Sequence, residues 1–401
     1  MPPPLNLCHP TPIFPPSTFH TSQINTLLTS ATAISPTLLT TDLKHLTTSF
    51  KTRYFRSTAG RDAAVWIHRR LESIINDSSH PNASVSFYNH TWIQPSVITR
   101  IQGVSNTTII LSTHLDSLNL YLPLLLPAPG ANDDASGVSA LISIISTLLS
   151  PKLPLHFTNT LEFHFYSAEE AGFWGSSEVL GNYNKEYRDI HSVLQFDMIG
   201  KVNTFNNNKN GKEEPGEIGI VNDFLGKGFR RYIKLIVGEY TGLKAVDTYC
   251  GYACSDHASA IRFGYPGGLL TSGRLEDVKG GDYSHTGGDT VDKLDLEGTL
   301  QFVRFGVAWG VELGFAELGG TGRRGYLCDN GYPDGWMGGV RRFSAARAAD
   351  PVGFGLWILV LVVLLGVARP WEEFPGLMRV GRRFRRGVRR GYTVLIRDAP
   401  D

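Results

Sequence analysis

The chain has 401 residues, of which 42% are hydrophobic and 43 are glycine. This length suits one large α/β domain with appendages, or two domains, and the composition suits a globular enzyme with many tight loops. Its 38 Lys and Arg residues almost balance its 37 Asp and Glu residues, so the net charge of +1 gives no overall basic footprint for nucleic acid.

Residues 1–20 are rich in proline and lack both charge and an apolar run, so they fit neither a signal peptide nor a membrane anchor and are predicted to be a disordered lead. Beyond them, apolar residues that recur every three or four positions predict helices, and short β-branched runs predict strands. The expected helices span residues 22–46, 59–75, 138–149, 224–240 and 295–318. The expected strands span residues 96–101, 108–111, 160–166, 192–196 and 218–221. Because strands alternate with helices, we expect a single globular α/β domain over residues 21–318, with a mostly parallel central sheet flanked by helices.

Two features predict an oxidising, lumenal or extracellular environment. Four N-x-S/T sequons, at Asn76, Asn82, Asn89 and Asn106, fall within 33 residues and predict a glycosylated face. Cys250 and Cys254 are close enough in sequence for a small disulfide loop, with a reduced pair as the alternative. No second Cys or His pair follows at the spacing of a zinc knuckle.

The part of the chain beyond residue 318 differs in composition from the predicted catalytic domain. Residues 319–350 are rich in Gly and Arg and predict a linker. Residues 352–368 run for 17 positions without a charge, which predicts a C-terminal transmembrane helix over 351–369, with a buried core helix as the alternative. Residues 370–401 form an arginine-rich tail, expected to be a cytoplasmic membrane flank rather than a nucleic-acid or nuclear-import patch.

These features predict a membrane-anchored enzyme of the secretory pathway with a lumenal catalytic domain, or alternatively a secreted enzyme. No cleavable leader is visible in this sequence, and a tail inserted after synthesis would leave the domain cytosolic. We therefore expect the true leader to be missing from the chain, or its start to be misassigned.

Acidic residues and histidines follow several predicted strands. They are His114 and Asp116, Asp133 and Asp134, Glu169 and Glu170, and Asp197, with His285 as a further candidate before the last helix. In an open parallel sheet the carboxyl ends of the strands share one edge, where ligands bind. So many carboxylates at one edge would repel one another and lose hydration unless cations were present. Two histidines with three carboxylates, one of them bridging, suit two Zn²⁺ ions, and a spare glutamate can then act as the general base.

Six motifs resemble the co-catalytic two-zinc aminopeptidases, the bacterial and fungal leucine-aminopeptidase type. They are HLDS, PGANDDASG, SAEEAG, QFDM, CGYACSDHAS and SHTGGDT, and the similarity in their order and spacing runs from about residue 22 to about residue 318. The stretch 267–281 departs from that family, because glycines, Thr271 and Arg274 stand where aromatic walls of the specificity pocket are usual.

The resemblance implies a role for each candidate. It implies that the zinc ligands are His114, Asp133, Glu170, Asp197 and His285, with Asp133 bridging two zinc ions per chain. It implies that Glu169 is the general base, that Asp116 orients His114, and that the Tyr252 hydroxyl helps to hold the tetrahedral intermediate.

Some alternatives remain at this point. From the residues alone Asp134 could be the bridge, and the resemblance favours Asp133, which leaves Asp134 to cap the next helix. His257 competes with His285, but it follows a helix-start signature and is expected to pack. His164 lies within a strand between Phe163 and Phe165 and is expected to be a core or face residue, and Glu162 lies too far from the end of that strand to reach the edge.

The resemblance implies an exopeptidase that removes N-terminal, apolar residues from peptides with a free N-terminus, by means of a metal-activated water. Two other functions stay open. One is a glutaminyl-cyclase-like enzyme with a single zinc ion, and the other is an inactive receptor or binding module on the same scaffold.

Overall fold

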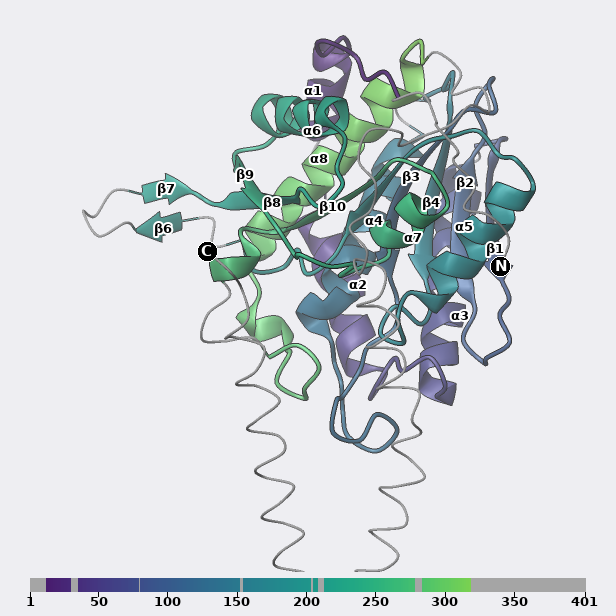
Figure 1. Ribbon diagram of the computed structural model, residues 1–401, viewed down its shortest axis with the longest axis vertical. Coiled ribbons are helices and arrows are strands. Elements are labelled where there is room, and N and C mark those ends of the chain that lie inside the picture. The colour runs from purple at the N-terminus through teal and green to yellow at the C-terminus, as the bar shows by residue number, and fades with distance from the viewer. Residues whose placement is uncertain are drawn as a thin grey trace, which may run out of the picture. The chain divides into compact units, whose positions relative to one another are not determined.

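The fold is built around an eight-stranded sheet with the strand order β1-β2-β4-β3-β5-β10-β8-β9 (Figure 1). The computed structural model describes residues 12–29, 35–78, 80–151, 154–202, 205–207, 213–277 and 283–318. The strands of this sheet are β1 (Ala83–Tyr88), β2 (Ser96–Ile101), β3 (Thr108–His114), β4 (Thr160–Tyr166), β5 (Ile190–Phe196), β8 (Glu217–Val221), β9 (Lys244–Thr248) and β10 (Gly267–Ser272). A separate antiparallel pair, β6 (Phe205–Asn207) and β7 (Glu213–Pro215), stands in the polar stretch before β8.

The sheet is mixed, which corrects the expectation of a mostly parallel one. The pairs β4–β3, β3–β5, β5–β10 and β8–β9 are parallel, whereas β1–β2, β2–β4 and β10–β8 are antiparallel. Strands β1 and β2 are joined by the short loop 89–95 with no helix between them, and such a connection allows only antiparallel pairing. The sequence did not predict β1 because it lies at the edge of the sheet with mostly exposed or half-buried side chains, so its apolar signal is weak.

Helices cover both faces of the sheet. The main helices are α1 (Thr21–Thr29), α2 (Pro36–Thr48), α3 (Thr58–Ser78), α4 (Ser136–Leu148), α5 (Trp174–Lys185), α6 (Lys227–Tyr240), α7 (His257–Arg262) and α8 (Leu296–Phe315), and the short helical turns are η1 (Ala131–Ala135), η2 (Leu275–Asp277) and η3 (Val291–Lys293). Side chains of α1–α4, α6 and α8 form the larger apolar core on one face. Those of α5 and α7 form a smaller core on the other, so the described residues make an α/β fold with a mixed sheet between two helical layers.

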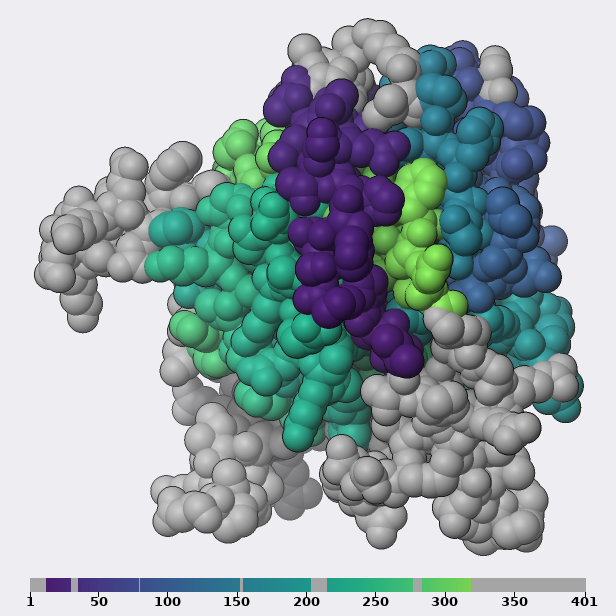
Figure 2. Space-filling view, turned by 90° about the horizontal axis from the view of Figure 1, so that it is seen from above, coloured from purple at the N-terminus to yellow at the C-terminus, as the bar shows by residue number. Residues whose placement is uncertain are grey.

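The N-terminal region differs from its prediction in two ways. The expected helix over 22–46 is two helices, because Pro36 begins α2 and the Ser35 side chain accepts a hydrogen bond from the Leu38 N–H as its N-cap. Residues 12–20, expected to belong to a disordered lead, pack against α6 and α8 (Figure 2). Phe14 is buried there, with its ring 4.7 Å from that of Phe229, and this apolar contact explains the order.

The predicted linker (319–350), transmembrane helix (351–369) and basic tail (370–401) lie outside the described residues, as do residues 1–11 of the lead. Among the residues that the structure does describe, no helix combines the length and the apolar character needed to cross a bilayer.

Candidate metal centre

Three neighbouring parallel strands carry the predicted site residues to one edge of the sheet. In the register of the sheet, His114 at the end of β3 pairs with Tyr166 at the end of β4, and β5 ends at Phe196 on the other side of β3. Glu169 and Glu170 follow β4, and Asp197 follows β5. We call this the carboxyl edge.

Two groups of side chains meet at the carboxyl edge. In the first histidine group, Nε2 of His114 lies 3.1 Å from Oδ1 of Asp133 and 3.6 Å from Oδ1 of Asp197. In the second histidine group, Nε2 of His285 lies 3.1 Å from Oδ2 of Asp133 and 3.0 Å from Oε1 of Glu170. Asp133 therefore turns one oxygen toward each histidine, which is the arrangement expected of a ligand shared by two ions.

Asp134 also lies close to the first histidine group, but its oxygens are already engaged. One oxygen accepts hydrogen bonds from the main-chain N–H groups of Gly137 (3.0 Å) and Met198 (3.2 Å), and the other accepts one from the Thr113 hydroxyl. These bonds fix the start of α4 and leave Asp133 as the better candidate for the bridge.

Asp116 lies behind the site and joins two of its parts. Its carboxylate accepts hydrogen bonds from the main-chain N–H groups of Glu169 (3.0 Å) and Glu170 (3.2 Å), and its Oδ1 lies 3.6 Å from Nδ1 of His114. The same Nδ1 is 3.2 Å from the main-chain oxygen of Asp116. Asp116 thus fixes the backbone of the glutamate pair as well as standing next to the histidine that it was expected to orient.

Several supporting residues were missed by the sequence analysis. The buried Asp289 accepts hydrogen bonds from the main-chain N–H groups of Asn132 and Asp133, each at 3.0 Å, and the hydroxyl of Ser255 donates to Oδ2 of Asp197 at 2.7 Å. Asp289 stands four positions after His285 in a segment already singled out, so its sequence context was a usable signal. Ser255 had no comparable signal.

Arg53 is the largest supporting residue that was missed. Its guanidinium is fully buried and donates to the main-chain oxygens of Leu115 (2.9 Å), Gly130 (3.0 Å) and Pro129. The loop between β3 and η1 is thereby tied to the body of the domain at both ends. A single arginine in a stretch without a motif gives no sign of this role.

The structure joins Cys250 and Cys254 in a disulfide with an S–S distance of 2.01 Å. Tyr252, between them, is exposed on that loop, which leads directly to Ser255 and so to Asp197. His257 is buried at the start of α7 and belongs to neither histidine group.

The electrostatics of the site favour cations. Burial opposes protonation of His285, yet the adjacent Glu170 and Asp133 raise the pKa of His285 to about 12. Burial also raises the pKa of Glu169 well above its ordinary value, and the neighbouring Glu170 and Asp197 add to that rise. Within the described part of the chain, the buried Nε2 of His114 and Oδ1 of Asp197 have no hydrogen bond. Imidazole nitrogens and carboxylates that face one another in this way are the donor set that zinc prefers.

The fold and the two histidine groups define a metal-dependent hydrolase of the α/β class. Residues 96–308 match the family described as peptidase family M28. Two curated relatives bear the name leucine aminopeptidase 1. The protein of Coccidioides posadasii (strain C735) is 39% identical over 76% of this chain and 77% of its own length. That of Paracoccidioides brasiliensis (strain Pb18) is 41% identical over 68% and 70%.

Two solved structures have a similar fold. The LapA aminopeptidase of Legionella pneumophila is 27% identical, with a TM-score of 0.66 over 75% of this chain and 76% of its own. The glutaminyl cyclase of Porphyromonas gingivalis, at 16% identity and a TM-score of 0.55, shares the fold. The chain belongs to peptidase family M28.

Proposed function

We propose that this chain, a zinc-dependent aminopeptidase of family M28, binds two zinc ions at the carboxyl edge and removes N-terminal residues from peptides. The aminopeptidase relatives at about 40% identity support the activity. The observation that supports two ions is the position of Asp133, which has one oxygen 3.1 Å from each histidine. In this proposal His114 and Asp197 hold one ion, Glu170 and His285 hold the other, and Asp133 bridges them.

When bound, the zinc pair would activate a water and polarise the carbonyl of the scissile bond. The remaining chemistry belongs to the protein. Glu169 accepts the proton of the attacking water and then delivers it to the leaving amine. Its burial close to His114 and Asp197, and the fixing of its backbone by Asp116, support this role.

Tyr252 is proposed to donate a hydrogen bond to the carbonyl oxygen as negative charge develops there. Its support is its place on the disulfide loop, which leads to the Asp197 side of the site. We propose apolar N-terminal residues as the preferred substrates, as the names of the leucine aminopeptidase relatives suggest.

Two other functions have less support. A glutaminyl-cyclase-like enzyme would need one zinc ion, whereas the described residues include two groups that could each hold one. An inactive binding module would be expected to lack a ligand or the base, and His114, Asp133, Glu169, Glu170, Asp197 and His285 are all present.

We propose in addition that the enzyme domain is lumenal or extracellular and carries N-linked glycans, with a membrane anchor in residues 351–369. All four sequon asparagines have exposed side chains, as glycosylation requires, and the Cys250–Cys254 disulfide suits an oxidising compartment.

Metal analysis of the purified full chain, combined with a panel of aminoacyl-anilides, tests the main proposal. We expect two zinc ions per chain, loss of leucyl-anilide hydrolysis in a chelator and recovery on addition of zinc. One zinc ion per chain together with cyclisation of N-terminal glutamine would favour the cyclase alternative. Absence of zinc-dependent turnover over the whole panel would favour the binding module.

A further inference from the structure

The loop that connects β3 to η1 exposes a run of large apolar side chains. We call residues 117–130 the apolar loop, and they contain no charged residue. The exposed fraction of its side chains ranges from 37% to 78% at Leu120, Tyr121, Leu122, Leu124, Leu125 and Leu126. Scattered apolar side chains are normal on a protein surface, but six within seven positions indicate an interaction site.

The apolar loop is fixed at its base, despite its exposed tip. The Arg53 guanidinium binds the main-chain oxygens of Pro129 and Gly130, and the Ser117 hydroxyl donates to the Ala128 oxygen at 2.8 Å. Inside the loop, the N–H groups of Leu125 and Leu126 both donate to the oxygen of Leu122. The tip is therefore held in a defined position relative to the sheet.

The apolar loop is also continuous with the candidate metal centre. It begins directly after Asp116 and ends three residues before Asp133. The main-chain N–H of Leu120 donates to the main-chain oxygen of His285 at 3.1 Å. Pro127 lies so close to Gly287 that a Cβ added there would be 3.3 Å from its ring. Figure 1 shows the loop projecting from the end of the sheet where β3 finishes.

Because the apolar loop adjoins the candidate metal centre, the peptide substrate is the partner expected to cover its apolar side chains. An aminopeptidase holds the N-terminus of its substrate at the metal centre, so the rest of the peptide must leave the site across the surrounding surface. On the side formed by the apolar loop, that surface offers leucine and tyrosine side chains and no charge. Apolar residues of a peptide gain most from burial against such a surface.

We propose that the apolar loop binds apolar side chains of the substrate downstream of the scissile bond. The enzyme then selects peptides by their third and fourth residues as well as by their first. This inference rests on the proposed aminopeptidase function and adds a second region of substrate recognition to it.

The test compares two double variants of the full-length, zinc-loaded enzyme. Tyr121→Ser/Leu125→Ser removes two exposed side chains from the apolar loop. Tyr187→Ser/Val104→Ser is the matched control, since it removes an exposed tyrosine and an exposed aliphatic residue elsewhere on the surface. The substrates are leucyl-anilide, a leucine-initiated pentapeptide with Leu and Phe at positions three and four, and the same peptide with Ser at both positions.

For the native enzyme we expect kcat/KM to be roughly tenfold higher for the apolar pentapeptide than for the serine pentapeptide, the scale of discrimination that an apolar surface provides. The loop variant should lose most of this preference, and its ratio of kcat/KM for the apolar peptide to that for the anilide should fall about tenfold. The control should keep both ratios.

Three outcomes would overturn the inference. The native enzyme could show no preference for the apolar pentapeptide, or its preference could survive in the loop variant. The anilide and the apolar peptide could also lose activity equally, which would place the effect at the metal centre. If the preference survives and the variant loses binding to phosphatidylcholine vesicles, the loop is a membrane contact instead. A native enzyme that does not hydrolyse the anilide would instead reject the proposed function.

Discussion

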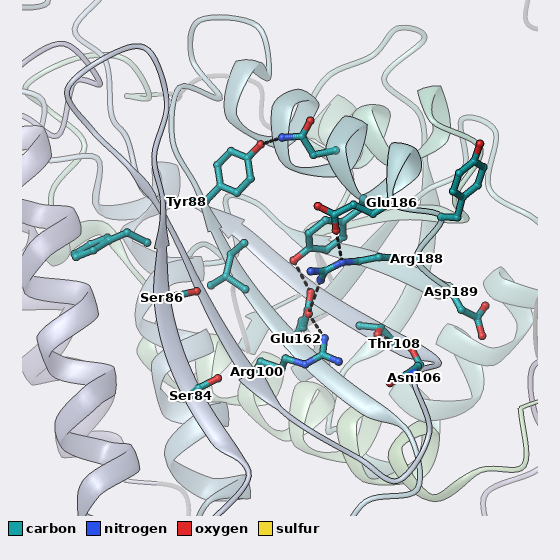
Figure 3. A pocket seen from close by; sticks show the side chains of 15 residues that line it. Ser84, Ser86, Tyr88, Arg100, Asn106, Thr108, Glu162, Glu186, Arg188 and Asp189 are labelled. Atoms are coloured by element: carbon teal, nitrogen blue, oxygen red, sulfur yellow. Dashed lines mark hydrogen bonds and ion pairs between the residues drawn. The ribbon is translucent and has the colours of Figure 1, made fainter.

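Strand β4 and the residues that follow it place buried acidic side chains in two different environments. Glu162, within the strand, lies in what we call the Glu162 cluster, where its carboxylate meets Arg100, Arg188, His164 and Tyr183. Figure 3 shows both guanidinium groups directed at Glu162. Glu162 lines a cavity of about 640 Å³. The His164 and Tyr183 contacts are 2.8 and 2.9 Å long. Every negative charge here faces a cation or a donor supplied by the protein.

At the carboxyl edge the same strand leads to Glu169 and Glu170, and the balance is reversed. Their acidic neighbours, Asp133 and Asp197, face histidines but no arginine or lysine within salt-bridge distance among the described residues. A buried carboxylate needs a partner, and at the carboxyl edge the partners are two histidines, whose nitrogens can ligate zinc instead of carrying protons. The contrast teaches that a buried acid alone does not indicate a metal site; a group of acids that faces histidines, and no arginine or lysine among the described residues, is the better candidate.

The largest predicted effect, on zinc content and hydrolysis, is expected at Asp133, which faces both histidines. Asp133→Ala removes the shared ligand, so the enzyme should lose most of its zinc, and leucyl-anilide hydrolysis should fall by at least about a thousandfold. In chelator, the variant should also be less stable than the native chain, because Asp133 is the carboxylate that both histidines face. Zinc analysis and urea unfolding measure both.

Glu162→Gln is the matched control for that experiment. It changes a buried acid of the same strand that lies beside arginines, and should leave two zinc ions per chain. If it removed zinc as Asp133→Ala does, the division of the acids into two environments would be wrong.

The second prediction distinguishes Glu169, the proposed general base, from the zinc ligands. Glu169→Gln keeps the shape of the side chain but cannot accept a proton, so kcat should fall by roughly 10² to 10⁴ with zinc content unchanged. Steady-state kinetics and metal analysis decide the outcome. A loss of zinc would make Glu169 a ligand, and a loss of less than tenfold would assign the base elsewhere.

The sequence predicted the carboxyl edge well because local rules apply to it. Short apolar or aromatic runs, β-branched in the case of β3, predicted β3 to β5, and acids directly after them are expected to meet at one edge of the sheet. Counting residues from the end of β4 likewise kept Glu162 away from that edge, as the structure confirms. Arg53 could not be found in this way, since it acts on main-chain groups far away in sequence, whereas Asp289 had a signal in its place four residues after His285. Strand β10 was missed because two glycines begin it.

The third effect concerns stability rather than activity. Glu162→Ala leaves two arginines and a histidine facing one another without their shared carboxylate, so unfolding in urea at pH 7 should show a loss of about 3–5 kcal/mol. The remaining folded enzyme should keep its zinc and its kcat. Glu72→Ala, on the exposed face of α3, should cost no more than about 0.5 kcal/mol. Equal losses of unfolding free energy in the two variants would show that the Glu162 cluster does not stabilise the fold more than an exposed residue does.

The smallest effect is the pH dependence of the same cluster. Burial alone would raise the pKa of Glu162, but His164 and the two arginines outweigh it and lower this pKa to about 2. A carboxylate with a lowered folded-state pKa stabilises the fold fully above its unfolded value, near 4.5, and this contribution disappears as the pH falls toward 2. Because Gln imitates the protonated acid, the gap in unfolding free energy between the native enzyme and Glu162→Gln should be up to about 3 kcal/mol above pH 5 and should shrink steadily below pH 4.5. Urea titrations at pH 6, 4 and 3 measure that gap, and a gap that stayed constant would mean that the charge of Glu162 is not what its neighbours stabilise.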